Sequence, residues 1–143
     1  MTTLIFRNKF VICELDDSVP VLKHRWLQPP PDQEFQQGLL NILKEYDKLA
    51  QTDNLKDLKW LADTELLGEL SEEVEDWLVS TWDHKIFDES GVKVHAVILG
   101  SDLFADYPME KFKMSSEDKF EKHGIRLGVF ANEEQAYDWL VKN

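Results

Sequence analysis

A run of three prolines at residues 29–31 separates two segments with different hydrophobic spacing. Before the run, residues 10–15 and 19–27 are rich in apolar and β-branched side chains and are joined by three polar residues. After it, apolar side chains recur over residues 33–51 at the period of an α-helix, about 3.6 residues. Because a strand cannot continue through consecutive prolines, the pattern predicts a β-hairpin followed by an amphipathic helix.

The expected helix begins after Asp32, which carries the short carboxylate favoured at an N-cap. Its apolar stripe contains Phe35, Leu39, Ile42 and Tyr46. Apolar residues at this spacing form one face of a helix, which is typical of a helix that packs on a hydrophobic core. We therefore expect it to be buried against a sheet that contains residues 58–61 and 94–99.

The rest of the chain alternates between short strands and helices, an order that favours parallel pairing. The expected strands are residues 58–62, 92–99 and 125–130. The expected helices begin at Ser71, at Ser101 with Asp102, and at Asn132, and Gly91 ends the first of them. Residues 1–143 are therefore expected to form a single α/β domain. It should have a mixed, largely parallel sheet with an N-terminal β-hairpin and flanking helices.

Composition narrows the functional classes. The 143 residues include 16 basic and 28 acidic side chains, so at a net charge of −12 the chain should repel nucleic-acid phosphates and anionic lipid headgroups. The longest apolar run, residues 96–99, is far shorter than the roughly 20 residues that span a bilayer. One cysteine and the lack of a visible signal peptide predict a cytoplasmic protein.

The negative charge is concentrated between residues 63 and 89, where Lys85 is the only basic side chain. Such a segment is typical of a solvated helix face that keeps a protein soluble. It also suits a docking face for a basic partner, centred on Glu72, Glu73 and Asp76. Both interpretations stay open from the sequence.

The motifs of common catalytic and cofactor sites are absent. The six glycines form no phosphate-binding loop, and no GxSxG or HExxH pattern occurs. One cysteine and four widely separated histidines do not give a metal-binding spacing. Cys13 lies in an apolar strand, where a small buried thiol is the usual outcome. We therefore expect a non-catalytic protein without a metal or cofactor.

Ligands of open α/β sheets bind beyond the carboxyl ends of the parallel strands. Here those ends lead into residues 63–65 and 100–104. Trp26 also ends an expected strand, beside the prolines, where it suits a rim position or an interface anchor. The expected binding residues are Trp26, Asp63, Thr64, Glu65, Ser101, Asp102 and Phe104. Helix capping and turn formation would also explain why polar residues occur in these two loops, without any ligand.

Several landmarks follow one another in an order that resembles a known family. After Trp26 and the prolines come the long helix and the segments KWLAD (59–63), LSEEVEDWL (70–78), DLF (102–104) and FANEEQAYDWL (130–140). Together they resemble the small bacterial SpoIIAA-like proteins, which are grouped with STAS and SEC14-type domains. The resemblance covers most of residues 4–141. It implies a mixed, largely parallel sheet with flanking helices, in a family of mostly uncharacterised proteins.

STAS domains of the anti-sigma-factor antagonist type carry a phosphorylatable serine after an aspartate, where a helix begins. The nearest feature here is Asp63 followed by Thr64, but a longer acidic loop comes next and the segment contains no arginine. A phosphate on Thr64 would add a charge of about −1.5 to −2 beside Asp63, Glu65 and Glu69. Like-charge repulsion should then loosen the loop.

Three functions follow from these patterns. The first is a regulatory or protein-interaction module of the STAS-like type, binding a partner protein or a second copy of the chain. The second is a small-molecule binding protein that holds an apolar or nucleotide-like ligand near Trp26, Trp60 and the loops 63–65 and 100–104. The third is an enzyme whose site combines Asp63, Ser101, Asp102 and a histidine. We favour the first, since no catalytic motif is present and the acidic segment is pronounced.

Overall fold

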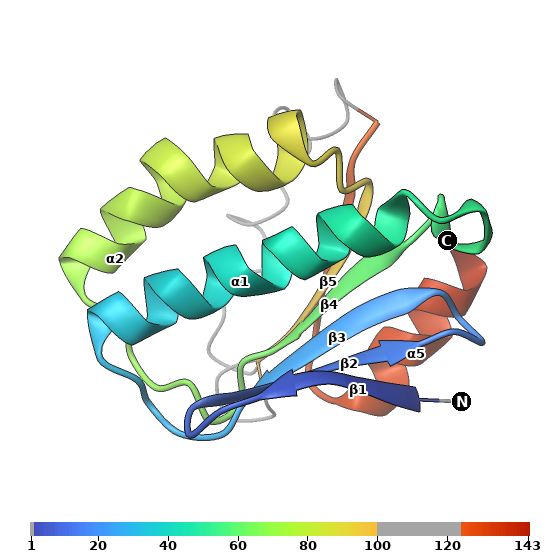
Figure 1. Ribbon diagram of the computed structural model, residues 1–143. Helices are drawn as coiled ribbons and strands as arrows, with labels where there is room; N and C mark the ends of the chain where they lie inside the picture. Colours follow the sequence, from blue (N-terminus) through green and yellow to red (C-terminus); the bar gives the residue numbers. More distant parts are fainter. Residues whose placement is uncertain (1, 100–123) are drawn as a thin grey trace.

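The computed structural model describes residues 2–99 and 124–143, which form a mixed sheet with helices on both faces (Figure 1). The strands are β1 (Thr2–Arg7), β2 (Val11–Asp16), β3 (Val21–Trp26), β4 (Lys59–Asp63), β5 (Val94–Ile98) and β6 (Arg126–Phe130). They lie side by side in the order of the sequence. The first two pairings are antiparallel and the next three are parallel. The predicted α/β class, the mostly parallel sheet and the hairpin are confirmed.

Helices α1 (Asp32–Ala50) and α2 (Glu72–Trp77) lie on one face of the sheet, and α5 (Glu133–Lys142) lies on the other (Figure 1). A short 3-10 turn, η1 (Asp53–Leu55), follows α1. The helix expected at Ser101 and Asp102 lies outside the described residues. Within residues 2–99 and 124–143, no helix is both long and apolar enough to cross a membrane.

Helix α1 buries the predicted stripe, since Phe35, Leu39, Ile42 and Tyr46 are all buried in the core. The Tyr46 hydroxyl donates a hydrogen bond of 2.8 Å to the carbonyl of Leu58, so α1 is fixed to the start of β4. The prediction that Asp32 caps this helix is wrong. Pro31 is the N-cap residue, because the helical backbone begins one residue earlier than predicted.

The carboxylate of Asp32 has another role. It accepts a 2.7 Å hydrogen bond from the hydroxyl of Ser71, which is the predicted N-cap of α2. The same Ser71 oxygen accepts from the backbone N–H of Val74 at 3.1 Å. One side chain therefore caps α2 and joins its beginning to the beginning of α1.

A close contact sets the distance between α1 and the sheet. A Cβ atom added to Gly38 would lie 2.9 Å from Cη2 of Trp26, so the helix needs a glycine there to pack directly on the indole. Trp26 is 1% exposed, and its ring lies 4.9 Å from the ring of Phe35. The expected rim or interface position of Trp26 is therefore wrong. The alternation along β3 directs its side chain into the core under α1.

After α2 the chain continues as π-helical turns, η2 (Leu78–Trp82) and η3 (His84–Glu89), where the sequence predicted continued α-helix. Aromatic residues recur here every five positions, at Trp77, Trp82 and Phe87. A π-helix bonds residues five apart, so this spacing places them on one stripe. The rings of Trp77 and Trp82 stack with centroids 5.9 Å apart. Gly91, at a φ of +69°, follows the segment, as predicted.

Truncating Leu39 tests this packing. Leu39→Ala should lower the free energy of unfolding by about 2–5 kcal/mol, because the 5%-exposed side chain would leave a cavity between α1 and the sheet. Urea unfolding followed by far-ultraviolet circular dichroism measures the change. Val141→Ala on α5 is the matched control, since Val141 is 67% exposed and its truncation should change stability by less than about 0.5 kcal/mol. Equal effects of the two substitutions would contradict the packing described.

Candidate functional site

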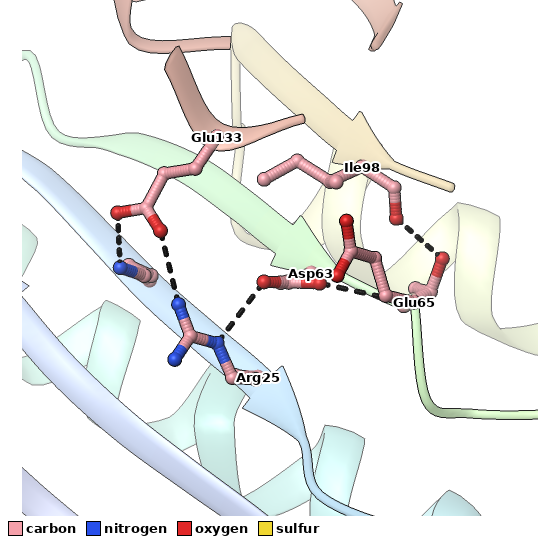
Figure 2. A network of polar contacts seen from close by, with 7 residues as sticks. Arg25, Asp63, Glu65, Ile98 and Glu133 are labelled. Carbon is pink, nitrogen blue, oxygen red and sulfur yellow. Dashed lines mark hydrogen bonds and ion pairs between the residues drawn. The ribbon is translucent and has the colours of Figure 1, made fainter. Parts of the chain in front are cut away.

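Four charged side chains alternate in sign where the ends of β3 and β4 meet the first turn of α5 (Figure 2). Arg25 is the register partner of Asp63, and its Nε donates to Asp63 Oδ2 at 3.0 Å. Its Nη2 donates to Glu133 Oε2 at 2.9 Å. Lys23 donates to the other oxygen of Glu133. This ion network, Lys23–Glu133–Arg25–Asp63, joins two strands to α5.

The ion network is electrically balanced. Asp63 is 5% exposed, and a buried carboxylate is destabilising unless a cation or hydrogen-bond donors face it. Burial of Arg25 alone would lower its pKa, but the hydrogen bond and charge of Asp63, with the charge of Glu133, raise that pKa above its usual value. Arg25 therefore remains a cation that neutralises Asp63. The arrangement stabilises the fold and leaves Asp63 poorly placed for acid–base chemistry.

Thr64 is held by the end of the neighbouring strand. Its backbone N–H and its hydroxyl both donate to the carbonyl of Ile98, at 2.9 and 2.7 Å. The other oxygen of Asp63 accepts from the backbone N–H of Glu65 at 3.2 Å, which shapes the turn after β4 (Figure 2). The hydroxyl that a kinase would modify is thus engaged in a hydrogen bond. Phosphorylation of Thr64 stays a prediction, and it would require this contact to open.

The turn after β4 has no basic residue of its own, but the fold places the guanidinium of Arg25 beside it. Arg25 comes from β3, 38 positions before Asp63, and its role was not predicted. One signal was available: Lys23 and Arg25 alternate with Leu22, His24 and Trp26 along a strand, which marks a second, polar face of the sheet. Glu65 is exposed beside the turn. The predicted binding residues Ser101, Asp102 and Phe104 lie outside the described residues.

Helix α2 directs its carboxylates outwards. Glu72, Glu73, Glu75 and Asp76 are exposed, whereas Val74 among them is buried. Within the described part of the chain, none of the four forms an ion pair. Val79 follows three residues later and is 68% exposed. The exposed side chains of Glu72, Glu73, Glu75, Asp76 and Val79 are called the α2 acidic surface below.

Two histidines lie on either side of Trp60: His24 is buried in the core, and His95 is partly buried with an enclosed Nδ1 atom. The His24 and Trp60 rings are 5.3 Å apart, and the Trp60 and His95 rings are 6.1 Å apart. Neither Nδ1 atom has a hydrogen-bond partner among the described residues. Burial lowers the pKa of both histidines to about 3, and the charge of His95 lowers that of His24 further. Both rings are therefore neutral at physiological pH.

The remaining candidates for chemistry are also enclosed or isolated. Cys13 is fully buried, and burial, with the charges of Glu45 and Glu14, raises its pKa to about 12. Its thiol is therefore protonated and unreactive at neutral pH. Among residues 2–99 and 124–143, no three histidine, cysteine or acidic side chains converge to hold a metal ion.

Comparisons with protein-family models, curated proteins and solved structures found no significant match to this chain. Membership of the SpoIIAA-like family is therefore a prediction that rests on the sequence landmarks.

Removing the arginine tests the ion network. Arg25→Met should lower the free energy of unfolding by about 1–3 kcal/mol, since Asp63 would keep a buried, unpaired charge. Urea denaturation at pH 7 measures this loss, and adding Asp63→Asn to Arg25→Met should recover part of it. Arg7→Met on β1 is the control, because Arg7 is exposed. A double variant less stable than Arg25→Met would contradict the pairing.

The buried histidines predict a loss of stability in mild acid. Their folded pKa values lie below the ordinary value of 6.5, so the unfolded chain binds more protons below that pH. Stability should be full above about pH 6.5 and should fall by about 1.4 kcal/mol per pH unit for each histidine as the pH drops further. Urea unfolding between pH 7 and 5 measures the slope. His24→Gln and His95→Gln should each reduce the slope, and slopes equal to that of the unmodified protein would refute the assignment.

Proposed function

We propose that this chain is a non-catalytic protein-interaction module of the STAS-like type, which docks a basic partner on the α2 acidic surface. The observation that carries the proposal is the exposure of adjacent carboxylates on Glu72, Glu73 and Asp76 without an ion pair among the described residues. Such carboxylates attract a basic partner over long range and speed its association. Val79 adds apolar area that a bound partner could cover.

Part of the charge on α2 has a structural explanation. Glu72, Glu73 and Glu75 lie near the amino end of the helix, where the helix dipole stabilises negative side chains. Asp76 lies beyond the first turn, where this stabilisation has largely decayed. Capping alone therefore does not account for the whole surface, which supports a docking role.

The carboxyl edge of the sheet supports a binding role less well. Asp63 and Thr64 use their polar atoms within the fold. Trp26 and Trp60 are each 1% exposed, so an apolar ligand would have to displace core contacts to reach them. The proposal keeps the predicted cytoplasmic location, which is supported by the single, buried thiol of Cys13.

Neutralising the surface tests the proposal. A triple variant, Glu72→Gln, Glu73→Gln and Asp76→Asn, should lose basic partners when the protein is used for affinity capture from its native cell extract. Capture by the unmodified protein should weaken steeply between 50 and about 300 mM salt, because screening shortens the range of the attraction. Mass spectrometry identifies and quantifies the captured proteins.

The control variant carries the same change in net charge elsewhere: Asp47→Asn, Glu134→Gln and Asp138→Asn, all at exposed positions. It should capture the same partners as the unmodified protein. If both triple variants capture the same set with the same salt dependence, the α2 acidic surface is a solubility feature and the proposal fails.

A further inference from the structure

A hollow of about 520 Å³ lies at the end of the molecule where strands β3, β4 and β5 begin. Its walls come from the turn before β4, the residues around the start of β5 and the last turn of α5. Figure 1 shows the chain terminus after α5 beside the turn that follows α1. The hollow therefore lies at the amino ends of these strands, whereas the ion network lies towards their carboxyl ends.

Lysines dominate this hollow although the chain is strongly acidic. Lys56, Lys59, Lys93 and Lys142 all line it, and Asp57 is the acidic side chain among its described lining residues. The whole chain has 16 basic side chains against 28 acidic ones. This excess of lysine over acidic lining residues favours a bound anion.

Two of the lysines, Lys59 and Lys56, contact other residues of the chain. Lys59 donates from Nζ to the carbonyl of Leu140 at the end of α5, so its ammonium is fixed in place. Burial lowers the pKa of Lys59 below its usual value, and a nearby anion would favour its charged form. Lys56 faces Asp53 at 3.6 Å in a pair whose side chains are 70% and 95% exposed. A surface pair of this kind is weak and can rearrange towards a ligand.

The hollow is also lined by Leu58 and Tyr46, which are 3% and 4% exposed. The Tyr46 hydroxyl is used in its hydrogen bond to Leu58, so the ring edge is fixed. The volume lies within the range of small-ligand pockets, about 300–1,000 Å³. A long polyanion such as a nucleic acid would meet the repulsion of the remaining acidic surface.

We propose that this lysine hollow is a binding site for a small polyanion of the di- or triphosphate class. Its phosphate groups would contact the ammonium groups of Lys56, Lys59 and Lys142, and any organic part would lie on Leu58 and Tyr46. A second site of this kind is independent of the α2 acidic surface, since the two share no residue.

Isothermal titration calorimetry of the full chain with sodium tripolyphosphate tests this site, with ATP as a second probe at the same ionic strength. Saturable binding of one equivalent is expected, weakening as salt is added. Equal affinities for the two probes would mean that the site recognises only the phosphates. Tighter binding of ATP would mean that Leu58 and Tyr46 also contact the organic part. Either result supports the site. Absence of saturable binding by either probe at millimolar concentration would overturn it.

Matched variants locate the binding. Lys56→Ala with Lys142→Ala should reduce the affinity for tripolyphosphate at least tenfold. Lys9→Ala with Lys44→Ala, two exposed lysines elsewhere, changes the net charge equally and should leave the affinity unchanged. An equal loss in both double variants would mean non-specific attraction and would refute the site. The triple variant of α2 should bind tripolyphosphate normally, so failure of one proposal is distinguishable from failure of the other.

Discussion

The core of this protein depends on the packing of aromatic rings around Trp60 of β4. Tyr46 of α1 and Trp82 of η2 approach it with ring centroids at 5.9 and 5.8 Å, and a histidine from each neighbouring strand lies beside it. Aromatic pairs at these distances stabilise a core beyond the apolar area that they bury. Helix α1 and the π-helical turn η2 therefore both contact a single indole. The aromatic spacing of the π-helical turns follows from the same requirement, since it keeps Trp77 stacked on Trp82.

The charged side chains at the two ends of the parallel strands are arranged differently. At the carboxyl end of β3 and β4, Lys23 and Arg25 are balanced by Glu133 and Asp63 within the fold. At the opposite end, four lysines and one aspartate, Asp57, line a hollow. Because the first end is internally neutralised, it is a poor recognition surface. The two recognition sites that we propose, the α2 acidic surface and the lysine hollow, both lie away from the carboxyl ends of the parallel strands, where ligands of α/β sheets usually bind.

The sequence predicted those parts of the fold that depend on neighbouring residues. The stripe of α1, the hairpin of β2 and β3, and the caps at Ser71 and Asn132 are local patterns, and the Asn132 side chain does accept from the Gln135 N–H at 2.9 Å. The ion network joins residues 38 and 108 positions apart, which no local pattern reports. The inward position of Trp26 depends on a glycine in the following helix. The π-helical turns were missed because an α-helical stripe explains Val74, Trp82 and Ile86 almost as well.

The sequential order of the strands also has a consequence for how the chain reaches this structure. Each strand pairs with its immediate neighbour in the sequence, so the sheet can be extended by one strand at a time from the β2–β3 hairpin. None of the six described strands has to be inserted between two that are already paired, and each extension closes only the loop to the next strand. Contacts of short sequence separation generally form early and speed folding. The topology thus provides a route in which new strands are added only at the edges of the partly built sheet, β1 beside β2 and β4 to β6 in turn beside β3.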